Sequence, residues 1–334
     1  MPYRFGTVGS YSKATSLIPT GKPMRIARTL PFTLAILLII ANRSASPQSP
    51  SRAQDPASDT EHHIHVNGTD RMYFLHVPTR LPDGKAAPLV LVFHGGGGHA
   101  ANMPKFTQFD PLADREGFFV AYPDSFNKSW NDGRGLSPAD DVGFVRLLIE
   151  QLQHSYKIDR KRVYATGISN GGFFSMRLAC DLSRQIAAVA AVAATMPEPL
   201  VPVCKPSAPV SAMFIHGTKD PLVHINGGPI GVRRDRGSAV SLREAAEFWR
   251  NQDRTSPNSV AEEVSESARD STQVHREMYG GGRDGTEVVV YIVEGGGHTW
   301  PGGSQYLPVF LVGKVSHKLD ATQVIWEFFK THRR

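Results

Sequence analysis

A serine between two glycines is the first residue of this sequence whose setting indicates chemistry. Residues 167–171 read GISNG and match the pattern G-x-S-x-G, in which a sharp strand-to-helix turn lifts the serine hydroxyl above a sheet. Small residues are needed two places on either side because side chains there would collide with neighbouring backbone. The motif follows a β-rich run and opens a helical one, so we predict that Ser169 is a nucleophile.

A histidine and a carboxylate must accompany such a serine, because a hydroxyl is a poor nucleophile at neutral pH without a supported base. Asp220 follows the strand-like run 210–216 in HGTKDP, and His298 follows the strand-like run 288–293 in GGGHTWPGG. Both residues are expected in loops just past the carboxyl ends of strands. We predict that Ser169, His298 and Asp220 form a catalytic triad, in the chain order serine, acid, histidine.

Other titratable residues compete for these roles less well. His216 ends a strand-like run, which favours a structural hydrogen bond, and His317 lacks the glycines that would hold a mobile imidazole loop. His224 is close to Asp220 in the sequence and is predicted at most to line the pocket. The pair at 140–141 is better explained as helix-capping or loop residues.

A glycine tract supplies the second part of the predicted site. His94 is followed by four glycines, directly after an apolar run typical of a buried strand. Unobstructed backbone N–H groups there can meet the negative charge that develops on an ester carbonyl oxygen. We predict an oxyanion hole formed by Gly96, with Gly97 as second choice, and by the N–H of Asn170. A phosphate loop is disfavoured because no Lys-Ser/Thr or G-x-G-x-x-G pattern follows.

Two tryptophans in glycine-rich loops are candidates for the substrate site. Trp130 and Trp300 each serve either as a packing anchor or as a wall of the pocket, and we predict the wall. The histidines at 62, 63 and 65 have no accompanying set of carboxylate or cysteine ligands, which favours a surface strand over a metal site. We therefore expect neither a metal nor another cofactor.

The elements that position these residues alternate along the chain. Runs at 64–66 and 72–77 joined across Asn67-Gly68 predict a hairpin. Strands separated by helices imply right-handed crossovers and a mainly parallel sheet with helices on both faces, which is the α/β-hydrolase plan with about eight strands. The runs that carry this prediction are strands at 88–94, 118–122, 162–166, 187–193, 210–216 and 288–293, and helices at 141–156, 173–180, 241–251 and 321–331.

The N-terminal residues predict export. Two arginines precede an apolar run at 30–41, which is too short to span a bilayer as a helix and is followed by small residues. We predict a signal peptide at 1–45, a flexible leader at 46–61 and a catalytic domain at 62–334; translation from Met24, an uncleaved anchor and a buried helix are alternatives. The polar stretch 254–286 is predicted to be an insertion or an irregular excursion.

The charge balance follows from the same division of the chain. Residues 1–45 carry six basic and no acidic residues, and removing these six from the 37 Lys and Arg leaves 31, equal to the 31 Asp and Glu. A neutral mature protein disfavours a nucleic-acid partner. We expect a secreted or periplasmic protein with no stable membrane insertion after cleavage.

The two cysteines are Cys180 and Cys204. Because an exported protein meets oxidising conditions, we predict that they form a disulfide, with two buried free thiols as the alternative.

Five ordered motifs between Met72 and the C-terminus resemble a known family. HGGGG, DDVGF, IDRKRVYATGISNGGFFSMRLAC, FIHGTKDPLV and GGGHTWPGG together resemble the secreted polyhydroxybutyrate depolymerase and feruloyl esterase-like family of α/β hydrolases. The resemblance implies ester hydrolysis outside the cell, the same triad and the Cys180–Cys204 bridge. Its members act on feruloylated polysaccharides, aryl or acetyl esters or hydroxyalkanoate polymers. This sequence departs from the family pattern at 254–286 and shows no appended polymer-binding module.

Three other functions use the same scaffold. Acyl transfer to a sugar or another alcohol would employ the same triad and differ only in the acceptor. Peptidase action lacks a second domain that would select peptides. A non-catalytic binding protein would be expected to have lost a triad member, and none is missing here. We therefore predict a carboxylic-ester hydrolase whose partner is an ester substrate, and the resemblance implies polysaccharide-linked feruloyl or acetyl esters, hydroxyalkanoate esters or small aryl esters.

Overall fold

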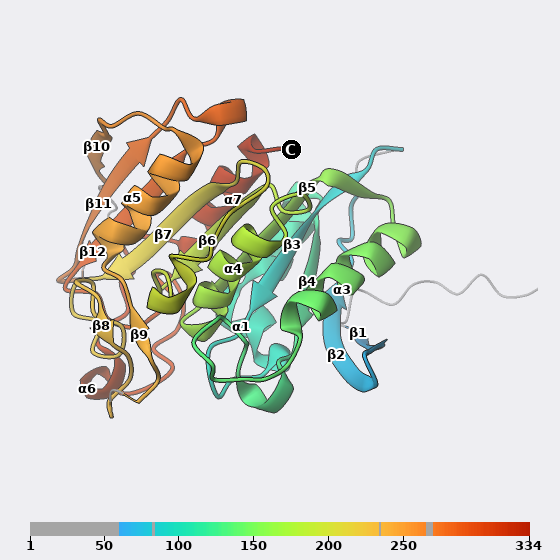
Figure 1. Cartoon of the computed structure of the whole chain (residues 1–334), viewed down its shortest axis with the longest axis horizontal. Coiled ribbons are helices and arrows are strands. Elements are labelled where there is room, and N and C mark those ends of the chain that lie inside the picture. Colours follow the sequence, from blue (N-terminus) through green and yellow to red (C-terminus); the bar gives the residue numbers. More distant parts are fainter. Residues whose placement is uncertain (1–59, 82–83, 234, 265–269) are drawn as a thin grey trace, which may run out of the picture. The chain divides into compact units, whose positions relative to one another are not determined.

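A ten-stranded sheet runs through residues 60–81, 84–233, 235–264 and 270–334, the part of the chain that the computed structural model describes (Figure 1). Its spatial order is β1-β2-β4-β3-β5-β6-β7-β12-β11-β10, and β8 (Gly228–Pro229) and β9 (Ser238–Ala239) form a separate ribbon. The strands are β1 (Thr60–Val66), β2 (Thr69–His76), β3 (Ala87–Phe93), β4 (Phe119–Pro123), β5 (Ile158–Ile168), β6 (Ala188–Val192), β7 (Ser211–Gly217), β10 (Val260–Glu263), β11 (Gln273–Tyr279) and β12 (Val288–Glu294).

The middle of the sheet is parallel. The strands from β4 through β3, β5, β6 and β7 to β12 pair in parallel with their neighbours. Every residue of β3, β4, β6 and β7 is buried, which explains their unbroken apolar sequences. Because parallel strands end at the same edge, the loops that follow β3, β5, β7 and β12 gather there.

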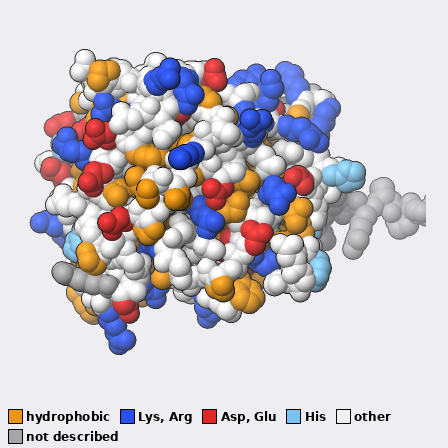
Figure 2. Space-filling view, viewed as in Figure 1, with side chains coloured by type: hydrophobic (Ala, Val, Ile, Leu, Met, Phe, Trp, Pro, Cys, Tyr) orange, Lys and Arg blue, Asp and Glu red, His pale blue; other side chains and the backbone are white. Residues whose placement is uncertain are grey.

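Helices cover both faces of this sheet. Leu91 belongs to a buried cluster that includes side chains of α3 (Asp141–Ser155), α4 (Asn170–Asp181) and α5 (Leu242–Asp253). Val92, on the opposite face, belongs to a cluster that includes side chains of α1 (Met103–Thr107), α2 (Phe109–Glu116) and α7 (Ala321–Thr331). Acidic and basic side chains lie intermixed over the face that α3, α4 and α5 cover (Figure 2). The short elements are η1 (Ala100–Asn102), η2 (Phe126–Lys128), η3 (Glu198–Leu200), η4 (Arg283–Gly285) and α6 (Val309–Val312).

The helices begin where capping residues occur in the sequence. Asp140 accepts a hydrogen bond from the Gly143 N–H at the start of α3, so it is the predicted capping residue. Ser241 and Glu244 form a capping box at the start of α5. Each such cap stabilises a helix by about 1 kcal/mol.

The two edges of the sheet are antiparallel. The β1–β2 hairpin turns at Asn67 and Gly68, both with positive φ (49° and 83°), as the predicted Asn-Gly turn requires. At the other edge β11 and β10 continue the sheet beyond β12. The prediction of an irregular excursion at 254–286 was therefore wrong for these strands, and the sheet has more than eight. All four residues of β10 are exposed, so no alternation of apolar residues reveals it.

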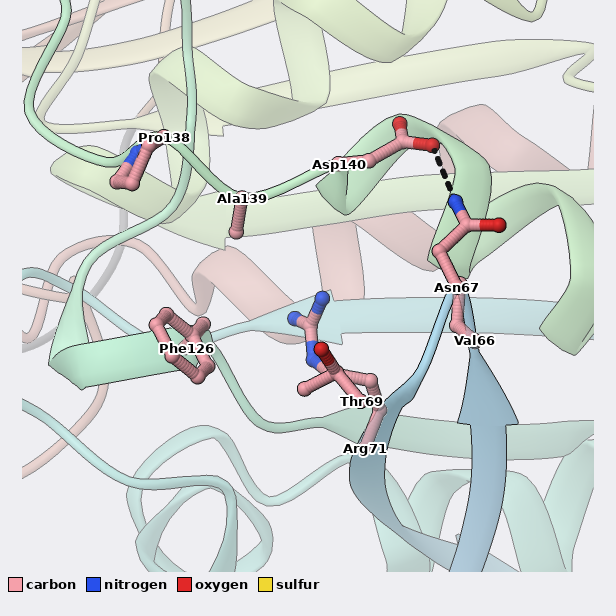
Figure 3. A pocket seen from close by; sticks show the side chains of 8 residues that line it. All are labelled: Val66, Asn67, Thr69, Arg71, Phe126, Pro138, Ala139 and Asp140. Atoms are coloured by element: carbon pink, nitrogen blue, oxygen red, sulfur yellow. Dashed lines mark hydrogen bonds between the residues drawn. The ribbon is translucent and has the colours of Figure 1, made fainter.

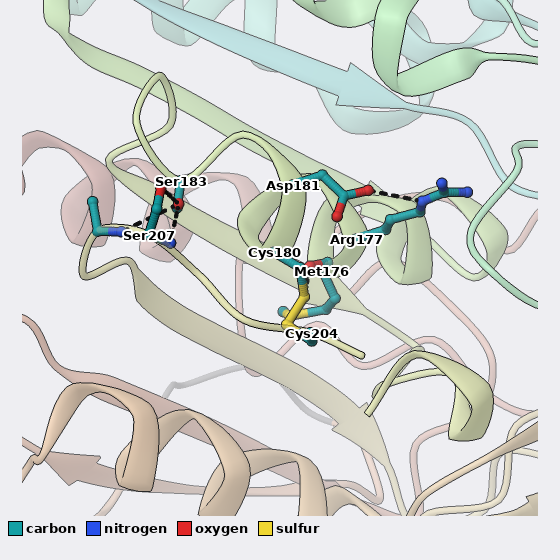
Figure 4. Close-up of a disulfide and its surroundings, with 8 residues drawn as sticks. Met176, Arg177, Cys180, Asp181, Ser183, Cys204 and Ser207 are labelled. Carbon is teal, nitrogen blue, oxygen red and sulfur yellow. Dashed lines mark hydrogen bonds and ion pairs between the residues drawn. A yellow bond between two sulfur atoms is a disulfide. The ribbon is translucent and has the colours of Figure 1, made fainter. Parts of the chain in front are cut away.

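A disulfide joins Cys180, near the end of α4, to Cys204, and their Cα atoms lie 5.1 Å apart (Figure 4). Close by, Ser183 Oγ accepts hydrogen bonds from the backbone N–H groups of Ser207 (2.9 Å) and Ala208 (3.3 Å). The bridge and these bonds tie the C-terminal end of α4 to the segment that leads into β7.

The predicted signal peptide and nearly all of the leader lie outside the described residues. Among the described ones, no helix has both the length and the apolar character needed to cross a membrane.

Candidate active site

A cavity of about 840 Å³ lies at the edge where the parallel strands end. Ser169, His298, Gly96 and Asn170 all line it, and they come from the loops after β5, β12 and β3 and from the start of α4. The remaining lining residues are His94, Gly95, Gly97, Gly98, His99, Asn102, Met103, Phe106, Arg134, Leu136, Ile168, Leu222, Ile230, Gly231, Val232, Arg233, Asp235, Arg236, Tyr306 and Leu307.

Ser169 occupies a strained turn. Its φ of 56° and ψ of −121° are unusual for a residue with a side chain, and its N–H donates to the Val192 carbonyl at 2.9 Å. A Cβ on Gly167 would lie 2.5 Å from the Phe93 carbonyl oxygen, and one on Gly171 would lie 2.6 Å from that of His94. Only glycine fits at these two positions, as the nucleophile-elbow pattern requires.

Asp220 and His298 meet in a buried hydrogen bond. His298 Nδ1 donates to Asp220 Oδ2 at 2.8 Å, although 78 residues separate the two in sequence. Asp220 Oδ1 accepts the backbone N–H groups of Leu222 (2.8 Å) and Val223 (2.9 Å). Both carboxylate oxygens are thus occupied, and the imidazole is held in one orientation with its Nε2 free of this contact.

Burial and the neighbouring imidazole act in opposite directions on this carboxylate. Burial raises the pKa of Asp220, but the charge and the hydrogen bond of His298 lower it, and the pKa lies below the usual range. The His216 Nε2–H donates to the Val223 carbonyl at 2.9 Å, the structural role expected from the sequence, and burial lowers its pKa. The site therefore contains an ionised carboxylate beside a neutral structural histidine.

Backbone contacts hold the loops of Asp220 and His298 together. A Cβ on Gly217 would lie 2.6 Å from the Gly297 carbonyl oxygen, and one on Gly297 would lie 2.6 Å from the Gly313 carbonyl carbon. The His298 N–H donates to the Val312 carbonyl at 2.5 Å, and the Lys219 N–H donates to Gly296 at 2.8 Å. The glycines around His298 thus let three chain segments pack backbone to backbone.

The glycine tract after β3 leaves few backbone donors for an oxyanion. The Gly97 N–H donates to the Lys128 carbonyl at 2.8 Å, and the Gly98 N–H donates to Gly95 at 3.0 Å. The second choice, Gly97, is therefore excluded, because its donor is already used. Gly96 stays the candidate. Asn170 is the first residue of α4, so helix geometry gives its N–H no acceptor within the helix.

The buried side chain of His94 holds the glycine tract after β3 in place. His94 Nδ1 donates to the Gly95 carbonyl at 2.7 Å, and His94 Nε2 lies 3.0 Å from Asp124 Oδ1. Asp124 also accepts the Ala100 N–H at 3.1 Å. Burial raises the pKa of Asp124, yet its contacts with His94 bring it below the usual value. Sequence reasoning missed this pair, because a lone Asp124 after a strand carries no pattern.

Trp130 does not line the cavity, so the prediction that it walls the substrate site was wrong. Its ring is fully buried and stacks on Phe174 with a centroid distance of 5.0 Å. Its backbone instead binds the Asn170 side chain, whose Oδ1 accepts the Trp130 N–H at 2.7 Å and whose Nδ2 donates to the Trp130 carbonyl at 3.1 Å. The indole points inwards, where its N–H donates to the His94 carbonyl at 3.0 Å.

Asp132 and Arg134 extend this contact into a network that sequence reasoning also missed. Asp132 Oδ2 accepts Asn170 Nδ2 at 2.6 Å and forms a buried ion pair with Arg134 Nη2 at 2.5 Å. The Arg134 guanidinium lies over the Phe173 ring, 4.3 Å from its centroid. The first turn of α4 is thus fixed by polar side chains of the 130–134 loop.

Trp300 is also buried, at 1% exposure, and does not line the cavity, so this prediction too was wrong. Its indole N–H donates to Thr322 Oγ1 of α7 at 3.0 Å, and its ring contacts those of Phe106 and Phe109. The ring is drawn inwards because α7 offers an acceptor for the N–H and the aromatic side chains offer apolar contact. Trp300 is therefore a packing anchor.

The competing histidines lie elsewhere. His224 and His317 are exposed and do not line the cavity. The ring of His62 stacks on Tyr73, and His63 contacts Glu61 and Asp70 at the surface. In the described ranges, no group of three or more His, Cys, Asp or Glu is placed to hold a metal ion.

A smaller hollow of about 290 Å³ lies between the β1–β2 turn and the start of α3 (Figure 3). Arg71 at its floor pairs with the buried Asp141 at 2.6 Å, and Asn67 Nδ2 donates to Asp140 Oδ2 at 3.2 Å. Asp140 and Asp141 therefore serve structure here. None of the residues predicted for catalysis lines this hollow.

Comparisons with known proteins identify related esterases. The family model described as Esterase PHB depolymerase matches residues 73–227. NocK of Nocardia uniformis subsp. tsuyamanensis, which carries the name of an esterase, is 31% identical over 288 residues, covering 81% of this chain and 83% of that protein. Feruloyl esterase B of Piromyces equi is 29% identical over 239 residues, and these cover 68% of this chain but only 42% of that protein.

Two solved structures share the fold. A thermostable esterase superposes with a TM-score of 0.53 at 17% identity, covering 83% of this chain and 63% of the other. Acetyl xylan esterase from Aspergillus awamori superposes with a TM-score of 0.52 at 16% identity, covering 72% of this chain and 94% of the other. The predicted α/β-hydrolase fold is therefore confirmed.

The fold and the matches to known esterases together show that the chain is a carboxylic-ester hydrolase. The chain belongs to the polyhydroxybutyrate depolymerase and feruloyl esterase-like family.

Proposed function

We propose that this chain is an exported serine esterase that uses Ser169, His298 and Asp220, with the N–H groups of Gly96 and Asn170 as oxyanion hole. The observation that carries the proposal is the buried hydrogen bond between His298 and Asp220 beside a cavity that Ser169 also lines. The basic and apolar N-terminal pattern of the sequence supports export.

The first half of the reaction forms an acyl-enzyme. Ser169 Oγ attacks the ester carbonyl carbon while His298 Nε2 takes the hydroxyl proton, and Asp220 stabilises the resulting imidazolium. The carbonyl oxygen becomes an oxyanion that accepts hydrogen bonds from the backbone N–H groups of Gly96 and Asn170. When the tetrahedral intermediate collapses, the C–O bond to the alcohol breaks, and the alcohol leaves with the proton from His298.

The second half releases the acid. A water molecule gives a proton to His298 Nε2 and attacks the acyl carbon, which forms a second oxyanion in the same hole. Collapse breaks the bond to Ser169, whose Oγ regains the proton. The products are an alcohol and a carboxylic acid, and the free enzyme is restored.

We further propose feruloyl or acetyl esters of polysaccharides as the substrates. Relatives named feruloyl esterase B and acetyl xylan esterase support this class. The cavity volume of about 840 Å³ is in the range that accepts a bulky acyl group.

Replacing the nucleophile tests the mechanism. Ser169→Ala is expected to lower kcat/KM for 4-nitrophenyl acetate by about 10⁴-fold or more, because the acyl-enzyme cannot form. A fluorophosphonate probe is expected to label the parent protein and not this variant. Ser155→Ala, at the exposed end of α3, is the matched control. Parental turnover by Ser169→Ala would contradict the proposal.

A substrate panel tests the specificity. We expect kcat/KM to be higher for methyl ferulate or acetylated xylan than for short hydroxybutyrate oligomers. Product analysis with an alcohol present separates hydrolysis from acyl transfer. A preference for the hydroxybutyrate oligomers would contradict the proposed substrate class.

A further inference from the structure

One side of the cavity is formed by residues 230–233 and 235–236, and backbone hydrogen bonds join Ile230 to Arg236 and Gly237. The Ile230 N–H donates to the Gly237 carbonyl at 2.9 Å, and the Arg236 N–H donates to Ile230 at 3.3 Å. The side chain of Arg236 lies over Gly231, because a Cβ there would be 3.5 Å from Arg236 Cγ and Cδ. The Arg236 side chain therefore runs back along its own chain segment, over Gly231.

The guanidinium of Arg236 reaches the predicted oxyanion hole. A Cβ on Gly96 would lie 3.1 Å from Arg236 Nη1 and 3.7 Å from Asn170 Cβ. Arg236 lines the same cavity as Ser169, and an arginine guanidinium carries a positive charge in proteins. A permanent positive charge thus stands next to the place where the ester carbonyl binds in the proposed reaction.

A second arginine anchors this arrangement. Arg134 is buried and paired with Asp132, and its Nη1 donates to the Arg236 carbonyl at 2.9 Å. A Cβ on Gly237 would lie 3.3 Å from Arg134 Cδ, so the two segments are in close contact. The 130–134 loop, which holds Asn170, therefore also holds the segment that carries Arg236.

The two arginines differ in how their charge is balanced. Arg134 has its carboxylate at 2.5 Å, whereas the Arg236 side chain makes neither an ion pair nor a hydrogen bond with any residue in the described part of the chain. Arg233 and Asp235 also line the cavity, and their side chains carry charges of opposite sign. Of the charged groups on this side, the Arg236 guanidinium is the one that lies beside Gly96, and no carboxylate in the described part of the chain is paired with it.

We propose that Arg236 is a specificity-determining residue that binds a carboxylate on the substrate, within a few bonds of the scissile ester. The proposal rests on the proposed ester hydrolysis and adds a substrate class, the acidic esters. A polysaccharide ester with a uronic acid beside the esterified sugar has this chemistry, as does an ester of a dicarboxylic acid. A guanidinium recognises a carboxylate through two parallel N–H···O bonds.

The test compares acidic and neutral esters of equal size. For the acyl side, the pair is the mono-4-nitrophenyl ester of adipic acid and 4-nitrophenyl hexanoate. For the alcohol side, the pair is acetylated glucuronic acid and acetylated glucose, followed by acetate release. The measured quantity is the ratio of kcat/KM for the acidic ester to that for the neutral one.

Arg236→Gln is expected to lower this ratio about tenfold in at least one of the two pairs, mainly through KM, because a charge-assisted hydrogen bond is lost. Arg236→Lys is expected to retain part of the preference, since it keeps the charge but not the paired donors. Added salt should lower the ratio of the parent enzyme more than that of Arg236→Gln. Arg243→Gln, exposed on α5 and outside the cavity, is the matched control.

The outcomes separate the inference from the function it rests on. An unchanged ratio in both pairs, with neutral esters still hydrolysed, would overturn the role of Arg236 and leave the esterase intact. An equal loss of kcat on acidic and neutral esters would also overturn it, because the guanidinium would then act on the oxyanion. Ser169→Ala tests the proposed function separately. If this variant still hydrolysed the esters, the serine esterase proposal would fail, whatever the Arg236 variants show.

Discussion

The two halves of the candidate site are held in place by different kinds of contact. On the acid–base side, which we define as the loops of Asp220 and His298, glycines let backbone pack against backbone and donate to carbonyls. On the oxyanion side, which we define as the glycine tract after β3, the 130–134 loop and the start of α4, polar side chains provide the contacts.

The two kinds of contact predict different sensitivities to substitution. A segment packed backbone to backbone has no space for an added methyl group. A segment held by a buried ion pair and amide bonds fails when one partner is removed, because the other is left unsatisfied. Three sets of substitutions, in decreasing order of their expected effect on turnover, test whether the two sides are held in these two ways.

The largest effect is expected from one methyl group on the acid–base side. Gly297→Ala would place a Cβ against the backbone of Val312 and Gly313, including a contact of 2.6 Å with the Gly313 carbonyl carbon. The chain must move there, and His298 moves with it. We expect kcat/KM for 4-nitrophenyl acetate to fall by about 10³-fold, because misplacing a catalytic base is costly.

The control for this glycine is Gly280→Ala, since a Cβ at Gly280 would meet nothing within 4 Å. Thermal unfolding of both variants shows whether the protein stays folded. A folded Gly297→Ala enzyme with parental activity would show that backbone packing does not position the base.

An intermediate effect is expected on the oxyanion side. Asp132→Ala leaves Arg134 as an unpaired buried cation and removes one of the two acceptors of Asn170 Nδ2. We expect kcat to fall by about 10- to 100-fold with little change in KM, because the N–H of Asn170 is needed mainly in the transition state. Steady-state kinetics on methyl ferulate measure both constants.

Asp132→Asn should recover part of this loss, since it can still accept from Asn170 while the charge partner of Arg134 is gone. Asp181→Ala, which removes a more exposed carboxylate paired with Arg177 at 3.1 Å at the far end of α4, is the control. Equal kinetics for Asp132→Ala and Asp181→Ala would mean that the network does not support catalysis.

The smallest effect on turnover is expected at the disulfide, which lies at the other end of α4 from Ser169. Replacing both cysteines by serine frees a loop closed over a separation of 24 residues and should lower the free energy of unfolding by about 3 kcal/mol. Activity per folded molecule should stay near the parental value. Chemical denaturation followed by fluorescence measures the first, and active-site titration with a fluorophosphonate measures the second.

A fall in activity per folded molecule that matches the Asp132→Ala result would place the C-terminal end of α4 in the oxyanion side. Unchanged stability would instead mean that the hydrogen bonds from Ser207 and Ala208 to Ser183 are sufficient to hold this end.

Much of the fold could be predicted from the sequence because the patterns that indicate its strands, helices and turns are local. The buried strands β3 and β7 are unbroken apolar runs, α3 has helical spacing after a capping aspartate, and Asn67-Gly68 marks the hairpin. β10 escaped prediction because an exposed edge strand needs no apolar alternation, and β11 escaped it because Val274 is its one buried residue. The burial of Trp130 and Trp300 could not be predicted, because the same glycine-rich sequence allows a loop to turn a ring inwards or outwards.

The order of strands and helices, and the positions of Ser169, Asp220 and His298 just after strands, could be predicted because motifs and hydrophobic periodicity act over a few residues. The use of the Gly97 N–H, the contact of Asp132 with Asn170 and the position of Arg236 beside Gly96 became known from the folded structure. These contacts join residues tens of positions apart, and their geometry depends on how whole loops pack, for which no local pattern of residues exists.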